Sequence, residues 1–260
     1  MNVLILFSGT KSFTKQMNKM NKDSGEIIYK DIRTLDLDNT FKPTYNVDIL
    51  EWKYKDVFTD FIPDFIHSSP VCCEFSKLKN HQHSKRNLTL GYSLFDKTIE
   101  IIEYVKTINP NLKFTIENPK SKLTLSYEPL IQFKRVITSY CKYGFLYQKD
   151  TTFFYGGFDL KLKDKCNRKN KCHSKSLTGN NCHKVRIGVS KNSKTHKLGI
   201  NQIGDNEYYK ELRLTPEYKN KNYTNQFFRY RIPSSLINDI LNCVSINDNI
   251  NEDSIIIEEI

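Results

Sequence analysis

The sequence predicts an α/β fold whose open parallel sheet binds ligands at the carboxyl ends of its strands. Residues 2–6 are a β-prone apolar run that passes directly into a glycine turn and a helix opened by Ser12 or Thr14. Residues 88–105 repeat apolar side chains with the 3.6-residue period of an amphipathic helix, and the strand-like residues 113–116 follow. Because strands and helices alternate, these runs favour a parallel sheet covered by helices.

Further apolar runs supply the remaining strands of this sheet. Residues 26–30 and 32–38 compete for the second strand, and residues 45–52 form a short third element. Residues 61–66 have the length and composition of a buried strand, and they lead into a turn that contains Cys72. The turn therefore places a thiol at the ligand-binding edge of the sheet.

The charge balance favours a polyanionic partner. Forty Lys and Arg residues against 29 Asp and Glu residues give a net charge of +11. Each basic side chain laid against a phosphate releases a condensed counterion, so nucleic acid is the first expectation and an anionic membrane surface the second. An AT-rich genome would raise the Lys count without any ligand, and part of the charge is discounted for that reason.

The cysteines and the lack of targeting signals predict an intracellular location. The seven cysteines are an odd number, and the sequence has neither a signal peptide nor a run of about 18 apolar residues. A reducing compartment, the cytoplasm or nucleus, is therefore expected, with thiols that are free or metal-bound. At 260 residues the chain can bury one substantial core and carry one smaller lobe. We expect a monomer with no membrane partner.

Three strand ends carry residues that could bind a ligand or take part in a reaction, namely Gly9, Cys72 and Glu117. The carboxyl ends of parallel strands meet at one edge of a sheet, so these residues are expected to lie together. A cysteine acts as a nucleophile only as the thiolate, which a tight turn near a helix N-terminus or a cation favours. A buried thiol with a packing role is the alternative for Cys72, because free Cys is among the most buried residue types.

Two aspartates are candidates for contacts with a nucleotide-like ligand. The turn at Gly9 would present backbone N–H groups to such a ligand. An acidic residue at the end of the second strand commonly accepts hydrogen bonds from a ribose; Asp36 is the first candidate, with Asp38 and Asp31 as alternatives. Asp48, in the third element, is placed where it would hold an adenine amino group.

Five motifs follow one another over nearly the whole chain. They are Phe7-Ser8-Gly9-Thr10, Ser69-Pro70-Val71-Cys72, Glu117-Asn118-Pro119, Tyr140-Cys141-Lys142-Tyr143-Gly144-Phe145 with Lys149-Asp150-Thr151, and residues 229–237. In their order and spacing they resemble the motifs of the DNA cytosine-5 methyltransferases, most closely the short phage and large-virus members. The resemblance implies a Rossmann-like, S-adenosylmethionine-dependent methyltransferase fold with a small, irregular recognition lobe.

The same resemblance assigns roles to individual residues. Cys72 would add to carbon-6 of a flipped cytosine, Glu117 would protonate or hydrogen-bond ring N3, and Asn118 would brace the loop. The residues expected to bind S-adenosylmethionine are Phe7, Ser8, Gly9, Thr10, Lys11, Asp36, Asp48 and Pro70. Those expected to contact double-stranded DNA are Ser76, Lys149 and Thr151.

The resemblance also divides the chain into three parts. Residues 1–150 would form the catalytic cofactor-binding domain, residues 151–222 a small target-recognition region, and residues 223–260 a C-terminal segment that returns to the catalytic domain. The middle part is basic and Asn-rich, which suits phosphate contact. For a viral or phage-like enzyme, the reducing compartment would be that of a host cell.

Three positions depart from the pattern of the family. The second glycine of the cofactor turn is Lys11, the proline before the nucleophile is Val71, and the proline expected after Lys149 is Asp150. Proline holds φ at about −65° and stiffens the turn that aims the thiol, so Val71 predicts a less rigid loop. Cys73 is the alternative thiol, although the residues that follow, 74–76, favour Cys72.

The basic region also contains soft metal ligands. Cys166, Cys172, Cys182 and His183 would be enough for a four-coordinate zinc ion. Their spacing matches no standard zinc finger, and adjacent Cys and His residues rarely both bind one tetrahedral ion. Free thiols in a DNA-binding loop are therefore the alternative.

Two other functions stay open. RNA enzymes related to the family keep the same catalytic motifs, so an RNA cytosine-5 methyltransferase is the alternative within the enzyme class. Because of Lys11 and Val71, a catalytically inactive, methyltransferase-like protein that binds nucleic acid is the alternative outside it.

Overall fold

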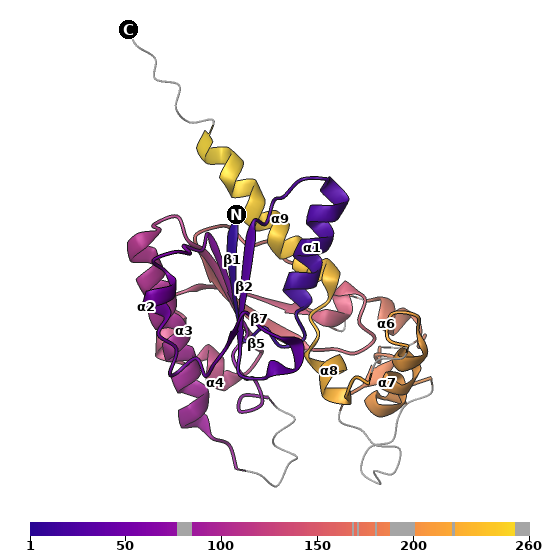
Figure 1. Ribbon diagram of the computed structural model, residues 1–260. Helices are drawn as coiled ribbons and strands as arrows, with labels where there is room; N and C mark the ends of the chain where they lie inside the picture. Colours follow the sequence, from indigo (N-terminus) through magenta and orange to yellow (C-terminus); the bar gives the residue numbers. More distant parts are fainter. Residues whose placement is uncertain are drawn as a thin grey trace.

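A seven-stranded sheet forms the centre of the molecule, with helices on both faces and a small lobe at one side (Figure 1). This computed structural model describes residues 1–76, 85–167, 169–170, 172–179, 181–187, 201–219 and 222–252, with side chains up to residue 245. Among these residues, no helix combines the length and the apolar character that crossing a membrane requires.

The sheet has the order β3-β2-β1-β4-β5-β7-β6. Its strands are β1 (Asn2–Leu6), β2 (Asp31–Asp36), β3 (Tyr45–Asn46), β4 (Phe65–Ser68), β5 (Lys113–Pro119), β6 (Lys134–Ser139) and β7 (Asp150–Gly156). The first five strands pair in parallel, and β7 runs antiparallel to both of its neighbours. The predicted α/β fold class is confirmed.

The strand order reverses beside β1, and this reversal creates the ligand-binding edge. From β1 the chain proceeds outward to β2 and β3, then returns to place β4 on the other side of β1. Leu6 pairs with Ser68, and Ser68 pairs with Ile116. The residues that follow these three positions therefore emerge side by side, at the switch point where open α/β sheets bind ligands.

The two faces of the sheet bury different helices. On one face lie α3 (Leu88–Ile108) and the short α2 (Tyr54–Val57), α4 (Lys122–Leu125) and α5 (Glu128–Ile131); on the other lie α1 (Ser12–Ser24) and α9 (Ser234–Glu252). Alternate residues of a strand point to opposite faces, so Leu4 and Leu6 join the α3 side whereas Val3 and Ile5 join the α1 side. Burial of each such side chain contributes roughly 2 kcal/mol.

Residues at each end of the long helix α3 explain where it begins and ends. The Asn87 side chain accepts a hydrogen bond from the Leu90 N–H and caps the first turn. The helix ends at Ile108, directly before Asn109 and Pro110. Its buried face, which includes Phe95 and Ile102, anchors the strands that carry the candidate site.

The small lobe is built from short elements. They are α6 (His173–Ser176), β8 (Val185–Arg186), β9 (Ile203–Gly204), α7 (Asp205–Leu214) and α8 (Asn225–Tyr230). A separate aromatic cluster, formed by Tyr147, Val185, Tyr209, Tyr218, Phe227 and Phe228, makes up its interior. The lobe therefore has a core of its own, much smaller than either core of the sheet.

Several boundaries differ from those that the sequence suggests. The second strand is β2 rather than residues 26–30, β3 has only two residues, and the fourth strand starts at Phe65 instead of residue 61. The sheet continues to Gly156, beyond the expected domain boundary at residue 150, because β7 pairs on both sides. Likewise α8 packs in the small lobe, and the return to the sheet is made by α9.

Candidate active site

The turn after β1 has an unusual backbone. Phe7, Gly9 and Lys11 have φ values of 56°, 44° and 56°, all in the left-handed region. The Gly9 N–H donates to Asp36 Oδ2 at 2.6 Å, and the other oxygen of Asp36 accepts from the Asp38 N–H at 2.9 Å. The carboxylate at the end of β2 therefore fixes the turn at the end of β1.

The same turn keeps polar groups available for a ligand. The Ser8 hydroxyl is buried and has no hydrogen-bond partner among the described residues. Helix α1 starts directly after Lys11 without a side-chain cap, so N–H groups of its first turn lack partners within the helix. An unpaired hydroxyl next to such N–H groups suits a polar ligand.

The other residues expected to bind the cofactor lie around this turn. The Ser69 N–H donates to Leu6 O at 3.2 Å, which places the Ser69–Pro70 loop beside the Phe7 turn. Pro70 is buried, and its carbonyl accepts from Asn118 Nδ2 at 3.1 Å. Asp48 is half-buried and accepts from the Leu50 N–H at 3.0 Å.

Hydrogen bonds to backbone carbonyls stabilise the turn that carries Cys72. The N–H groups of Phe75 and Ser76 donate to Cys72 O at 3.1 and 2.9 Å. The Arg86 guanidinium donates to the carbonyls of Glu74 and Ser76 and so closes the turn from outside. These contacts constrain the loop although Val71, rather than proline, precedes the thiol.

Glu117 lies inside β5 and is almost fully buried, with 3% of its surface exposed. Ser69 Oγ donates to its Oε2 at 2.5 Å, and the Tyr140 hydroxyl donates to its Oε1 at 3.1 Å. Lys149 Nζ lies 3.7 Å from Oε1 and 4.5 Å from the centre of the Tyr140 ring. Burial, reinforced by the charge of Glu117, raises the pKa of Tyr140 well above its usual value, so its hydroxyl remains a hydrogen-bond donor.

The Cys72 thiol is close enough to this network to respond to its charges. Burial raises the pKa of Cys72 to about 11, and Glu117 contributes in the same direction, whereas Lys149 lowers it. Burial outweighs the cation, so the thiol is mainly protonated at neutral pH in the free protein. Formation of the thiolate there requires a proton acceptor or a change of surroundings when a substrate binds.

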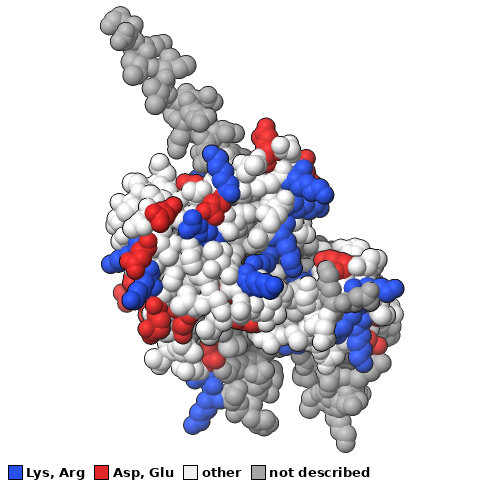
Figure 2. Space-filling model, in the orientation of Figure 1, with Lys and Arg blue, Asp and Glu red and all other residues white. Residues whose placement is uncertain are grey.

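A cleft of about 730 Å³ opens between the sheet and the small lobe. Its lining includes Cys72, Cys73, Ser76, Pro119, Lys120, Gln148, Lys149, Asp150, Lys165, Cys182, His183, Val185, Arg186, Ile187, Gln202, Arg229 and Tyr230. Five of these residues are basic and one is acidic, so the cleft favours an anionic ligand. On the face drawn in Figure 2, several acidic side chains lie along the α2 and α3 side of the molecule, and others lie near α1 and on the small lobe.

Only some of the residues that the sequence suggests for substrate contact line the cleft. Ser76 and Lys149 line it. Thr151 does not: it is fully buried in β7 between Pro119 of β5 and Thr138 of β6, and its assignment to substrate contact is corrected. The physical reason is that Thr151 lies inside the sheet, whereas Lys149 precedes β7.

Sequence reasoning missed several neighbours of the site. Ser69 and Tyr140 hold Glu117, although each belongs to a motif already recognised. Arg229 and Tyr230 line the cleft from α8, while the Ile232 N–H donates to Ser12 Oγ at 3.3 Å beside the first turn. Residues 229–237 thus contact both the cleft and the start of α1, which directly follows the turn that is expected to bind the cofactor.

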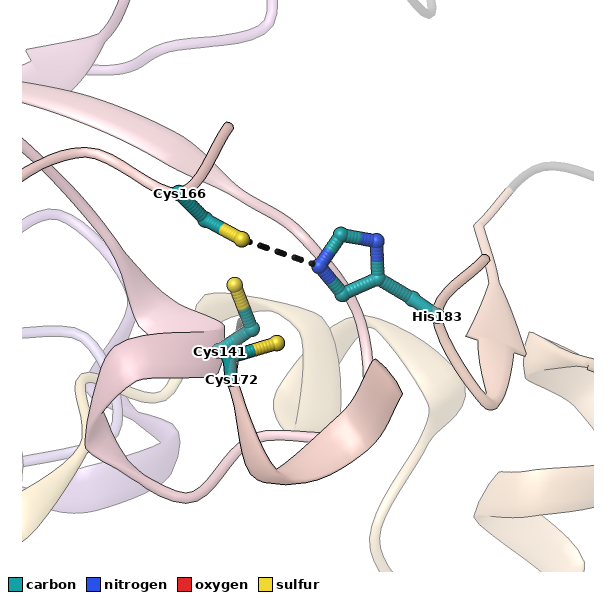
Figure 3. A group of neighbouring side chains, drawn as sticks. All are labelled: Cys141, Cys166, Cys172 and His183. Atoms are coloured by element: carbon teal, nitrogen blue, oxygen red, sulfur yellow. Dashed lines mark hydrogen bonds between the residues drawn. The ribbon is translucent and has the colours of Figure 1, made fainter. Parts of the chain in front are cut away.

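A cluster of three thiols and one imidazole lies where the sheet meets the small lobe (Figure 3). The ligand atoms of Cys141, Cys166, Cys172 and His183 all lie within 4.8 Å of one another. Cys182 is exposed and does not join them, so Cys166, Cys172 and His183 of the set that the sequence suggests lie together, with Cys141 as the fourth member of the cluster. Cys141 was missed because it belongs to the segment after β6, far from the other three in sequence.

No family model matches the chain. Over 154 residues it is 28% identical to a probable DNA (cytosine-5)-methyltransferase of Frog virus 3 (isolate Goorha), a match that covers 55% of this chain and 64% of the viral protein. The resemblance read from the motifs is confirmed. The match nevertheless spans less than two thirds of the viral relative.

A solved structure extends the comparison to the whole fold. The Entamoeba histolytica methyltransferase EhMeth superposes with a TM-score of 0.52 at 12% identity, over 95% of this chain and 98% of that chain. At this identity the likeness shows the fold alone, which is the Rossmann-like methyltransferase fold. The viral relative and the fold together support a methyltransferase.

Proposed function

We propose that the chain is an S-adenosylmethionine-dependent DNA (cytosine-5-)-methyltransferase that acts through a covalent adduct of Cys72. The observation that carries the proposal is the placement of Cys72 and Lys149 in one basic cleft, with Glu117 near enough to shift the pKa of the thiol. A nucleophile, a carboxyl group and a cation at one strand edge are the groups that this reaction needs.

Carbon-5 of cytosine is a weak nucleophile, and the chain has residues that would activate it. The Cys72 thiolate would form a bond to carbon-6, and the displaced ring electrons would move toward carbon-5 and N3. Glu117, held by Ser69 and Tyr140, would donate or share a proton at N3. After carbon-5 has received the methyl group, loss of its proton to a base and departure of Cys72 as the thiolate would restore the aromatic ring.

The turn after β1 would hold the cofactor. The unpaired Ser8 hydroxyl and the Asp36 carboxylate are polar groups that fit a nucleoside ligand, and the left-handed backbone at Gly9 forms the turn beside them. S-adenosylmethionine, when bound, supplies an electrophilic methyl group. Ser69 links this turn to the Cys72 loop through its hydrogen bond to Leu6, so the two sites would be held side by side.

The cleft suits a flipped base and its strand. A cytosine cannot react inside a stacked duplex, and its extrusion costs a few kcal/mol. Tyr230, which is 41% exposed, offers an aromatic face in the cleft, and Lys120, Lys165 and Arg186 offer charges for phosphates. Partly for this reason we propose double-stranded DNA as the partner.

Covalent trapping tests the proposal. With S-adenosylmethionine and a duplex that contains 5-fluorocytosine, we expect an adduct that mass spectrometry locates on Cys72. Cys72→Ser should abolish the adduct, while Cys73→Ser, its matched neighbour, should retain it. If the unmodified chain binds the duplex normally but forms no adduct, the enzyme proposal fails and the inactive nucleic-acid-binding protein takes its place.

A parallel assay decides the substrate class. Transfer of a tritiated methyl group is measured to duplex DNA and to tRNA under the same conditions. Faster transfer to DNA is expected, because the viral relative is a probable DNA (cytosine-5)-methyltransferase. Transfer to tRNA alone would establish the RNA alternative while leaving the Cys72 mechanism intact.

A further inference from the structure

We propose that Cys141, Cys166, Cys172 and His183 bind a structural zinc ion that ties the small lobe to the sheet. This site lies outside the residues that would perform the methyl transfer, and it would bind zinc whether or not that reaction takes place. Three sulfurs and one imidazole nitrogen are a donor set that zinc prefers in closed, four-coordinate sites.

The geometry is close to that of a metal site. A Zn–S bond is about 2.3 Å long, so two ligand atoms on one tetrahedral ion lie roughly 3.8 Å apart. The four ligand atoms here lie within 4.8 Å of one another, and Cys166 Sγ is 3.6 Å from His183 Nε2. Figure 3 shows the three thiols and the imidazole directed toward a common point. Small side-chain rotations would complete the tetrahedron.

The sulfurs have no convincing role in apolar packing. Cys141, Cys166 and Cys172 are buried with one another, apart from the hydrophobic clusters of the sheet and of the lobe. Three thiols cannot all be paired in disulfides, and the imidazole beside them would be a poor partner in a hydrophobic core. A shared metal ion accounts for all four side chains at once.

A buried cation beside the cluster supports the same inference. Three thiolates, one neutral imidazole and Zn²⁺ carry a net charge of −1. Lys175 is only 5% exposed, and the described residues include no carboxylate that pairs with it. Its ammonium donates to Asn167 O at 2.7 Å and lies near enough to affect Cys166 electrostatically. An anionic metal site would supply the countercharge that this lysine lacks.

The four ligands come from both sides of the junction. Cys141 lies in the 3₁₀ turn η3 (Tyr140–Tyr143), directly after β6 and next to Tyr140 of the candidate active site. Cys166 is anchored to the end of β6 by its N–H, which donates to Ser139 Oγ at 2.9 Å. Cys172 caps α6, and His183 lines the cleft. The ion would therefore fix one wall of the cleft against the sheet.

Metal analysis of the full chain tests the site directly. After expression with zinc and dialysis against metal-free buffer, about one tightly held zinc ion per chain is expected for a closed site. Cys141→Ser should lose the metal, whereas Cys182→Ser should keep it because Cys182 is an exposed neighbour of His183 outside the cluster. Absence of zinc from the full chain would overturn the proposal, and so would loss of zinc in Cys182→Ser.

A second measurement covers the case in which Cys141→Ser fails to fold. Cobalt is exchanged for zinc in the full chain, and the absorption spectrum is recorded. Intense d–d bands together with sulfur-to-cobalt charge transfer are expected from a tetrahedral site with three thiolates. A weak, octahedral type of spectrum would contradict the assignment. Neither measurement requires methyl transfer, so failure of the proposed function would leave this result unaffected.

Discussion

The sheet and the small lobe achieve order by different means. The sheet has seven strands and an apolar core on each face, and its strand register alone brings the Phe7, Cys72 and Glu117 segments together. The lobe has two-residue strands and one aromatic cluster, and the group of three cysteines and a histidine lies where it meets the sheet. A unit this small rarely buries enough surface to be stable alone, so its stability depends on cross-links such as a metal ion and on its contacts with the sheet.

Removal of the metal proposed for the lobe should produce the largest difference between the two regions. On chelation, amide exchange in α6, residues 182–187 and α7 should rise by roughly 10³-fold or more, because structural zinc supplies much of the folding energy of such units. Strands β1, β4 and β5 should keep their protection. Hydrogen exchange read by mass spectrometry measures both regions in one experiment.

The control for this comparison is Cys182→Ser, which should respond to the chelator as the unmodified chain does. If the lobe and the sheet lose protection together, the molecule has one cooperative unit rather than two. If the amide protection of neither region changes, the aromatic cluster alone orders the lobe, and a zinc ion would have no structural role there.

On the sheet side, Glu117→Gln should slow methyl transfer by about 10² to 10⁴-fold, the usual contribution of a general acid. The amide oxygen can still accept from Tyr140 while its NH₂ group donates to Ser69 Oγ, so folding should be retained, while the proton for N3 is lost. Glu103→Gln, on the exposed side of α3, is the matched control and should transfer methyl groups at the unmodified rate. Similar rates for all three proteins would remove Glu117 from the mechanism.

Much of the sheet was predictable because its signals are local. The apolar run of β1, the period of α3 and the turn residues between them depend on neighbours in sequence. The meeting of Gly9 and Asp36 was also predictable, since adjacent parallel strands end together. The site fixed by these strand ends was therefore largely visible in the sequence.

The parts that could not be predicted depend on contacts between distant segments. Whether Thr151 faces the cleft or the sheet is decided by where β7 begins, and no local pattern marks that position. Cys141 joins Cys166 only because η3 and the lobe pack against each other. Likewise the pKa of Cys72 depends on its burial and on the charges of Glu117 and Lys149, which lie far from it in sequence.

The pH dependence of thiol labelling should sharpen the contrast between the regions. Below its pKa of about 11, Cys72 is protonated, so its thiolate fraction and its rate of alkylation should rise about tenfold per pH unit from pH 7. Cys182 of the lobe is exposed and should react faster at neutral pH. Alkylation of both residues by iodoacetamide can be followed in one digest by mass spectrometry.

The variant Lys149→Met tests whether the lysine affects the pKa of Cys72. Lys149 lowers the pKa of Cys72, so its loss should raise that pKa and slow labelling of Cys72 several-fold at pH 8. Labelling of Cys182 should not change. Lys134→Met, an exposed substitution on β6, is the control. Equal Cys72 rates in the two variants would mean that the cation does not act on the thiol.

The smallest effect concerns strain in the turn after β1. Lys11 has φ 56° and ψ 34°, a left-handed conformation that costs a side-chain-bearing residue about 1 kcal/mol. Lys11→Gly should relieve this strain and, after the entropy that glycine adds to the unfolded chain, stabilise the protein by about 0.5 kcal/mol. Thermal unfolding should detect a rise of roughly 1 to 2 °C. Lys19→Gly, inside α1 and exposed, should instead destabilise by about 1 kcal/mol. A different result is that both variants lose the same stability. The hydrogen bond from Lys11 Nζ to Lys42 O would then stabilise the turn by more than the strain costs, and Lys11 would take the place of the glycine that the family has there.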